Sequence, residues 1–222
     1  MKTKKLVTSA MLLAFATILS LIRIIQFPFG GSVTLVSMMP IIILTYMYGC
    51  KWGLFASFVF SLLQLATGFD TVSAFFLPGD AKMALPAAIS ICLIDYILAY
   101  TALGLGGVFK NKLKNPTKEI VLGTIVALTT RYIFHIISGY VFFGAWAEWF
   151  FGDSTGLMQI GFLKPFCQFV MNNAGSKLLS LIYSVIYNGA YMIPEIILTA
   201  FIVPVVFKIL KKQSGTVPSS RS

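Results

Sequence analysis

The sequence predicts an all-α membrane protein with six transmembrane helices and with both termini in the cytoplasm. Its 222 residues are 58% hydrophobic and only 11% charged, whereas roughly a quarter of the residues in a soluble domain are charged. The mean hydropathy is +0.88. The apolar residues gather in six segments, and most of these approach the ~20 residues that a helix needs to cross a bilayer. We therefore expect a single integral membrane domain over residues 1–222.

Each apolar segment is interpreted as one helix. The six helices are expected at about residues 6–27, 33–49, 52–69, 86–109, 119–144 and 178–210. Lys2, Lys4 and Lys5 before the first helix and the small-residue triplet Ala14-Phe15-Ala16 within it resemble a signal peptide with its cleavage site. However, the apolar run continues through Ile25. This length favours an uncleaved helix.

The segments between the helices differ in length and charge. The second and third helices meet at Lys51, and lysines fill the connection between the fourth and fifth. The external connections are long, at about 70–85 and 147–177. Because the second of these includes Gly161-Phe162-Leu163-Lys164-Pro165-Phe166, we expect either an interfacial helix or a lid there. The tail, about 213–222, is expected to be disordered.

Lysine and arginine set the orientation, because they are retained on the cytoplasmic side during insertion. With the N-terminus inside, the inner segments hold 12 of the 17 basic residues. The remaining five are Arg23, Lys82, Arg131, Lys164 and Lys177. The bias agrees at every inner segment and therefore supports cytoplasmic termini.

Composition and motifs exclude several classes of function. The net charge of +10 comes from short clusters between apolar runs, not from a basic patch with interleaved aromatic residues, so no nucleic acid is expected as a partner. Cys50, Cys92 and Cys167 are odd in number and widely spaced, which indicates neither disulfides nor a metal site. The sequence contains no HExxH, GxSxG or Walker motif. We expect no enzyme activity, no cofactor and no metal.

Four ionisable side chains lie inside apolar segments: Asp95, Arg131, His135 and Glu195. Each costs several kcal/mol at membrane depth unless it is paired, faces a cavity or binds something. Arg131 and Glu195 both fall near mid-depth, which favours a structural ion pair between them. Asp95 needs a partner, which is Arg131, His135 or a bound cation.

The topology brings polar residues of three helices to one level in the outer half of the membrane. Asp95 and Tyr96 lie about 13–15 Å below the outer surface by helical rise. The other residues expected near this level, or above it at the outer rim, are His135, Gly139, Phe143, Trp146, Tyr183 and Asn188. An acid, an imidazole, a carboxamide, phenols and aromatic faces suit a small, partly cationic aromatic ligand.

Some of these residues have simpler interpretations. Trp146, Trp149 and Tyr191 are equally typical of an interfacial aromatic belt, and Asn188 is typical of a hydrogen bond between helices. Ala10 and Ala14 form a small-xxx-small step, which lets a second helix approach closely, either in this chain or in a partner. Gly104-Leu105-Gly106-Gly107 indicates close packing or a helix end.

An ordered set of short motifs resembles a known family. The motifs are Gly30-Gly31-Ser32-Val33-Thr34-Leu35, Met39-Pro40-Ile41, Trp52-Gly53-Leu54, Leu62-Leu63-Gln64-Leu65, Asp95-Tyr96 with Ala99, Ala102-Leu103-Gly104-Leu105, the run 131–139, Phe142-Phe143-Gly144, and the run 183–189 with Pro194. Together they resemble the thiamine-specific substrate-binding (S) component of energy-coupling factor (ECF) vitamin transporters. The resemblance spans most of the chain.

The resemblance implies a six-helix protein of the bacterial cell membrane that captures thiamine from outside. Its partners would be membrane lipid, a transmembrane coupling subunit and two ATPase subunits. The family's ligand contacts match Asp95, Tyr96, His135, Gly139, Tyr183 and Asn188, and its docking alanines match Ala10 and Ala14. Two positions depart from the pattern: Asp95 stands where Glu is frequent, and Phe143 stands where some relatives have Trp.

Two alternatives remain open. The first, which these departures leave open, is an S component for a related ligand, such as the pyrimidine precursor of thiamine, or for another vitamin. The second is a small membrane enzyme or assembly factor that uses Asp95 and His135 as acid and base.

Overall fold

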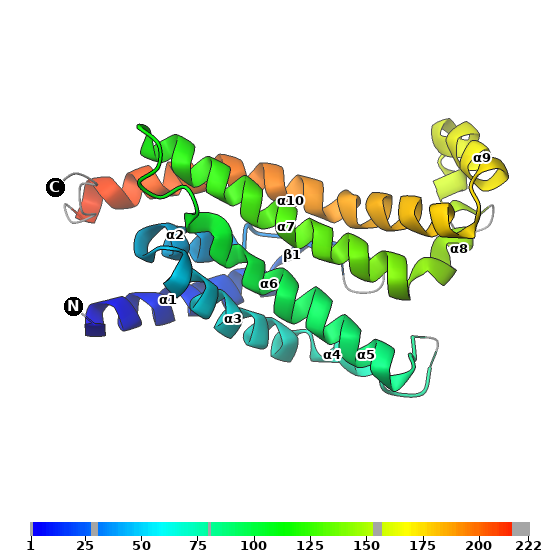
Figure 1. The fold of residues 1–222 in the computed structure, drawn as a ribbon, viewed down its shortest axis with the longest axis horizontal. Coiled ribbons are helices and arrows are strands. Elements are labelled where there is room, and N and C mark those ends of the chain that lie inside the picture. The colour runs from blue at the N-terminus through cyan, green and yellow to red at the C-terminus, as the bar shows by residue number, and fades with distance from the viewer. Residues whose placement is uncertain (1, 28–30, 80, 153–156, 215–222) are drawn as a thin grey trace.

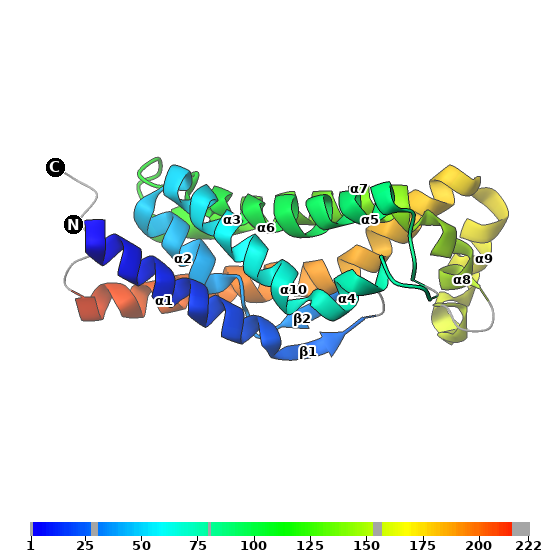
Figure 2. The ribbon, with the colours of Figure 1, turned by 90° about the horizontal axis from the view of Figure 1, so that it is seen from below.

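The computed structural model describes residues 2–27, 31–79, 81–152 and 157–214. Long helices run roughly along one axis, and α1 begins at the end of the molecule where α10 terminates (Figures 1 and 2). In the described residues, five helical stretches are long and apolar enough to cross a membrane: Lys2–Leu21, Cys50–Thr67, Leu85–Gly107, Pro116–Phe142 and Ser176–Lys212. The chain is therefore an all-α membrane protein apart from one small hairpin.

The helices follow the predicted segments, with shifted ends. The main elements are α1 (Lys2–Leu21), α2 (Met39–Tyr48), α3 (Cys50–Thr67), α4 (Phe69–Ala74), α5 (Leu85–Ile91), α6 (Ala99–Thr101), α7 (Pro116–Phe142), α8 (Ala147–Phe151), α9 (Lys164–Asn173) and α10 (Ser176–Ser214). Short 3-10 turns cover Ala102–Gly107, Gly144–Trp146, Leu157–Gln159 and Gly161–Leu163. α10 continues through Ser214, and the rest of the predicted tail lies outside the described residues.

The first two predicted helices, 6–27 and 33–49, are shorter than expected. α1 ends at Leu21, and β1 (Arg23–Gln26) pairs antiparallel with β2 (Ser32–Thr34). α2 keeps only 10 residues, about 15 Å of helix, so it is too short to cross a bilayer alone. The β-branched Ile24 and Ile25 favour a strand as well as a helix, and the hairpin satisfies its own backbone groups by pairing.

The fourth spanning stretch is continuous but irregular. Between α5 and α6, residues Cys92–Leu98 form a π-helix. Such wide turns occur mostly as short insertions in α-helices and are frequent at functional sites. Asp95 lies in this turn, so the π-helix sets the direction of the predicted ligand-binding carboxylate.

Glycines allow the helices to approach closely at the lysine-rich end of the bundle. A Cβ atom at Gly104 would lie 2.5 Å from the Leu54 Cα atom, and one at Gly107 would lie 2.5 Å from the Thr45 carbonyl oxygen. The 3-10 turn that carries these glycines thus packs directly on α2 and α3. The close-packing interpretation of Gly104-Leu105-Gly106-Gly107 is confirmed.

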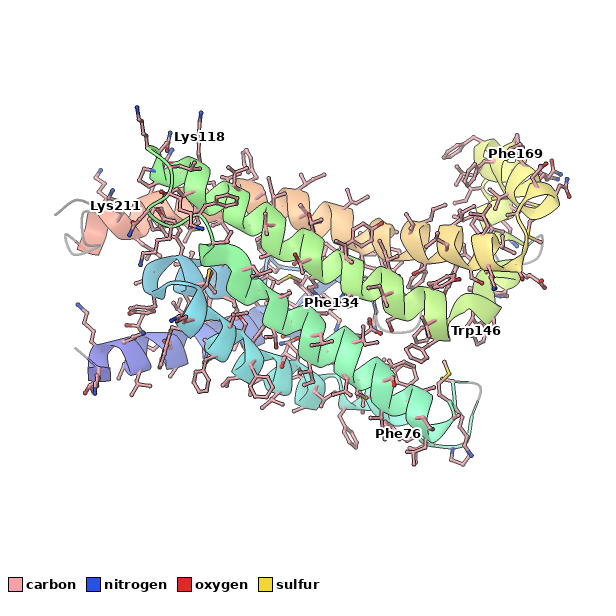
Figure 3. All side chains as sticks on the ribbon, in the orientation of Figure 1. Phe76, Lys118, Phe134, Trp146, Phe169 and Lys211 are labelled. Atoms are coloured by element: carbon pink, nitrogen blue, oxygen red, sulfur yellow. The ribbon has the colours of Figure 1, made fainter. Side chains whose placement is uncertain are left out.

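The two ends of the molecule differ in chemistry. Lys118 and Lys211 lie at one end, and Phe76, Trp146 and Phe169 lie at the other (Figure 3). α8 and α9 occupy the aromatic end, beside the start of α10 (Figure 1). α7 and α10 run side by side between the two ends (Figures 1 and 2). Together with the π-helix they line the candidate binding cavity.

Candidate binding cavity

A cavity lies between the π-helix, α7, α10 and the β-hairpin. Its empty space is about 830 Å³, part of it open to solvent. Seven of the predicted ligand-binding residues line it: Asp95, Tyr96, His135, Gly139, Phe143, Tyr183 and Asn188. The structure thus brings together side chains from three separate stretches of the sequence.

Asp95 is held by two side chains of α7. Its Oδ1 atom lies 2.8 Å from His135 Nδ1, and its Oδ2 atom accepts a hydrogen bond of 2.5 Å from the Ser138 hydroxyl. Because an ionised carboxylate can only accept, Nδ1 of His135 carries the proton. The other ring nitrogen, Nε2, is buried and has no partner among the described residues. The pair therefore offers a fixed negative charge and a free imidazole acceptor.

Asn188 ties α10 to α7 behind the cavity. Its Nδ2 atom donates to the His135 carbonyl oxygen at 3.2 Å and to the Ser184 carbonyl oxygen at 2.8 Å. Its Oδ1 atom accepts from the Tyr191 hydroxyl at 2.6 Å. The interpretation of Asn188 as a hydrogen bond between helices is thus confirmed, and the same side chain forms part of the cavity wall.

Gly139 lies in the cavity wall at a point of close approach between α7 and α10. A Cβ atom there would lie 2.9 Å from Asn188 Nδ2 and would overlap the Ser184 hydroxyl. A side chain at this position would therefore push α10 away from α7. Its place in the cavity wall follows from this close contact.

Three tyrosines of α10, which the sequence did not single out as a group, form an aromatic wall. Tyr183, Tyr187 and Tyr191 are spaced by four residues and so share one helical face. Adjacent ring centroids are 5.7 Å and 6.2 Å apart, and the Tyr187 hydroxyl is buried without a partner among the described residues. The i, i+4, i+8 spacing of these tyrosines was the sequence signal for a shared aromatic face. It was not used, because Tyr191 was interpreted as a residue of the interfacial aromatic belt.

Trp146 is not among the residues that line the cavity, so its contact with the ligand stays a prediction. α7 ends at Phe142, and Trp146 lies in the 3-10 turn Gly144–Trp146 that follows it. Its ring packs edge-on against Trp149, with centroids 6.1 Å apart. Phe143 does reach the cavity, where its ring meets Phe75 at 5.9 Å.

The predicted ion pair between Arg131 and Glu195 is not formed; within the described ranges, the one contact within 4.0 Å between a basic and an acidic side chain is that of the His135 imidazole with Asp95. Glu195 instead accepts hydrogen bonds from the Thr34 N–H at 3.0 Å and the Thr34 hydroxyl at 2.8 Å. Arg131 reaches the cavity, with Nη1 2.7 Å from the Met38 sulfur. The hairpin, which was not predicted, supplies hydrogen-bond donors to the Glu195 carboxylate. These hydrogen bonds take the place of the predicted ion pair with Arg131.

The predicted docking alanines, Ala10 and Ala14, lie on an exposed face of α1. The opposite face, with Ser9 and Ala16, is buried, and the Ser9 hydroxyl accepts from Trp52 Nε1 at 2.9 Å. Packing inside this chain therefore uses the other face of α1. The alanine face is available for lipid or for a partner helix.

The described part of the chain holds no group of three or more His, Cys, Asp or Glu residues able to bind a metal ion. Its three cysteines are free. The site is instead an aromatic cavity with one clamped carboxylate, which suits the binding of an organic cation.

The fold and the cavity together define a multi-pass membrane protein that binds a small molecule. Residues 6–151 match the family described as "Thiamine transporter protein (Thia_YuaJ)". The chain belongs to this family of transport proteins, which are not enzymes, and it is located in the bacterial cell membrane. The alternative of an enzyme built on Asp95 and His135 is thereby set aside.

Two individual proteins are similar to this chain over most of its length. The thiamine transporter ThiT of Bacillus subtilis (strain 168) is 27% identical over 214 residues, covering 91% of this chain and 90% of the relative. The solved structure of ThiT from Listeria monocytogenes superposes with a TM-score of 0.64 at 22% identity, covering 95% of this chain and 97% of that chain. The structural likeness shows that the fold is shared.

Proposed function

We propose that this chain is the thiamine-capturing S component of an ECF-type importer. The observation that carries the proposal is the Asp95–His135 pair, fixed by Ser138 inside an aromatic cavity. Thiamine joins a cationic thiazolium ring to an aminopyrimidine ring. Such a ligand needs one negative charge, aromatic faces and a few directed hydrogen bonds, and this cavity supplies all three.

The roles of individual residues follow from their places in the wall. Asp95 would face the cationic ring, and the unpartnered Nε2 atom of His135 would accept from a ligand N–H group. The rings of Phe143 and Tyr183 would cover the ligand faces. The Asn188 amide already accepts a hydrogen bond from Tyr191 and donates one to the α7 backbone. We therefore assign Asn188 chiefly to shaping the cavity.

Release into the cell would require a coupling module. We place both termini and the lysine-rich end in the cytoplasm, in agreement with the separation of Lys118 and Lys211 from Trp146 and Phe169 (Figure 3). The exposed Ala10–Ala14 face of α1 is the proposed contact with the transmembrane coupling subunit. Two ATPase subunits would complete the importer.

A ligand panel on the purified protein tests the proposal. The midpoint temperature of thermal unfolding in detergent should rise with thiamine and stay unchanged with riboflavin and biotin, because only a ligand that binds the folded state stabilises it. Calorimetry should then give a stoichiometry of about one ligand per chain. A shift with the pyrimidine precursor alone would assign the cavity to that alternative ligand, and no shift with any of the four would contradict the proposal.

A further inference from the structure

The external segment between α7 and α10 takes no part in the cavity wall. Its helices α8 and α9 lie at the aromatic end of the bundle (Figure 1). Among the described residues that line the cavity, none comes from residues 147–175. The sequence allows this segment to be a lid or an interfacial helix, and the structure gives it no part in enclosing a ligand.

One face of α9 is fixed to α8. Cys167 is fully buried and belongs to the same apolar cluster as Phe151 of α8. The ring of Phe166 also meets Phe151, with centroids 6.4 Å apart. Phe150, the neighbour of Phe151, packs on Tyr183 of α10 at 5.1 Å. These contacts hold α9 to the bundle and leave its other faces free.

A second face of α9 is apolar and exposed. Phe162, in the 3-10 turn that leads into α9, and Phe166 and Phe169 of α9 itself are 82%, 43% and 66% exposed. Spacings of four and three residues place them along one stripe of a helix, which we call the phenylalanine stripe. A contiguous apolar patch of this kind marks a surface that contacts a partner or a membrane.

A third face of α9 is polar. Lys164, Gln168 and Asn172 are exposed and follow one another at intervals of four residues. Gln168 and Phe169 are neighbours in sequence, so they differ in direction by about 100° around the helix. A helix with an apolar face and a separate polar face is typical of one that lies in the plane of a membrane interface.

The place of α9 in the chain supports this interpretation. Ala174 and Gly175 alone separate it from α10, where Leu178 is exposed at the start of a stretch that is apolar enough to cross a membrane. Phe169 lies at the end opposite Lys118 (Figure 3), and we place that end outside the cell. The phenylalanine stripe is therefore close to the level at which lipid begins.

The charges around α9 also suit a lipid surface. Lys164 begins α9, Lys177 follows its end, and both are exposed. Lysines near a membrane are attracted by the negative charge of anionic lipids. The headgroup layer thus complements the lysines, and the chains beneath it complement the phenylalanine stripe.

We propose that α9 is a fixed membrane anchor and not a lid. It lies in the interface of the outer leaflet, with the phenylalanine stripe among the upper parts of the lipid chains and with its polar face towards the headgroups and water. The partner of this surface is phospholipid. The lipid contact does not depend on the proposed function.

The test measures the depth of spin labels on the purified protein in nanodiscs of phosphatidylethanolamine and phosphatidylglycerol. Cys50→Ser, Cys92→Ser and Cys167→Ala remove the native thiols. One new thiol is then introduced by Phe169→Cys, or by Gln168→Cys as the matched control on the polar face. Electron paramagnetic resonance compares the access of oxygen, which concentrates in lipid, with that of a water-soluble nickel chelate.

We expect the ratio of oxygen access to nickel access to be several-fold higher at position 169 than at position 168. The ratio at position 169 should stay the same when thiamine is added, because a fixed anchor keeps its depth. Equal ratios at the two positions overturn the proposal, whether both labels face water or both face lipid. A label at position 169 that moves between lipid and water on addition of thiamine identifies α9 as a lid and also overturns it.

Two further measurements keep the test decisive. A thermal melt verifies that each labelled variant is folded. If the cysteine-free chain does not fold, hydroxyl-radical footprinting of the unaltered protein in the same nanodiscs takes its place: the phenylalanine stripe should be protected, and strong oxidation of its three rings overturns the proposal. A protein that does not bind thiamine contradicts the proposed function, and the comparison of the two labels without ligand still decides the lipid contact.

Discussion

Thr34 on β2 and Glu195 on α10 are 161 residues apart in the chain, yet the carboxylate of Glu195 accepts both the N–H and the hydroxyl of Thr34, at 3.0 Å and 2.8 Å. The contact fastens the hairpin to the same helix that carries the aromatic wall. Gly31 of the hairpin also lies against the Tyr191 ring, where a Cβ atom would come within 2.7 Å of it. One side of the cavity therefore depends on this attachment.

Thr34→Val should lower the stability of the protein. It removes a hydroxyl donor from a buried carboxylate, a loss of about 1–3 kcal/mol, which should appear as a lower midpoint of thermal unfolding without ligand. Thr130→Val is the control, because the Thr130 hydroxyl bonds only to the Val126 carbonyl oxygen of its own helix, at 2.8 Å. Equal midpoints for the two variants would contradict a role for the Thr34–Glu195 contact.

Asp95→Asn should weaken thiamine binding by at least ~1.5 kcal/mol, the lower end of what a charge-assisted hydrogen bond contributes. The change removes the negative charge and keeps the size of the side chain. Calorimetry in detergent measures the effect, with Asp70→Asn on the exposed side of α4 as the control. Unchanged affinity in Asp95→Asn would rule out direct attraction between this carboxylate and the ligand.

Ser138→Ala should weaken thiamine binding less than Asp95→Asn does. It frees one oxygen of Asp95 from its hydrogen bond, so the carboxylate keeps its charge but loses its fixed direction, and we expect a loss of about 3- to 10-fold. Ser61→Ala is the matched control, since Ser61 is equally buried and bonds to the Phe58 carbonyl oxygen of its own helix. A loss in Ser61→Ala as large as in Ser138→Ala would indicate a general packing effect.

Gly139→Ala should reduce both stability and ligand affinity. The added methyl group would overlap the Ser184 hydroxyl and press on Asn188, and overpacking of this kind typically costs about 1–3 kcal/mol. Gly161→Ala is the control, because a Cβ atom there meets nothing within 4 Å. Wild-type unfolding and wild-type binding in Gly139→Ala would show that the two helices can separate without cost.

Replacing Ala10 and Ala14 together by leucine should separate binding from transport. Both residues lie outside the cavity on the exposed face of α1, so thiamine affinity in detergent should stay at the wild-type value. Uptake of labelled thiamine by cells that express the complete importer should fall sharply. The exposed Val185→Leu on α10 is the control for a bulkier side chain facing lipid, and normal uptake by the alanine variant would place docking elsewhere.

The polar residues within apolar segments were enough to predict most of the site. Asp95, His135 and Asn188 are unusual at membrane depth, and helical rise alone placed them at one level. Tyr187 and Tyr191 were not predicted as lining residues, because a tyrosine near a helix end is equally typical of the interface. The contact of Arg131 with the cavity was not predicted, because the sequence favoured an ion pair between Arg131 and Glu195. In the structure, Glu195 binds Thr34 of the hairpin instead.

Hydropathy was enough to predict the class of fold. It did not predict the ends of the first two helices or the hairpin between them. Hydropathy does not distinguish a helix from a short apolar hairpin, and Ile24 and Ile25 are compatible with either. In the sequence, Pro28, Gly30 and Gly31 are residue types that favour turns, and they were the available signal for a break. No sequence pattern predicted the π-helix around Asp95, since its backbone hydrogen bonds depend on tertiary packing.

That wide turn, Cys92–Leu98, makes the length of this segment as important as its composition. A chain with one residue fewer here would close into an ordinary α-helix and would still cross the bilayer. Because the wide turn takes up one extra residue, the helical stretches on either side would keep nearly the same faces towards the bundle, while the residues within the turn would change direction. Asp95 lies within the turn, so the acid would no longer meet both of its α7 partners. Recognition in this protein is therefore encoded in the spacing of its main chain as well as in the identity of its side chains.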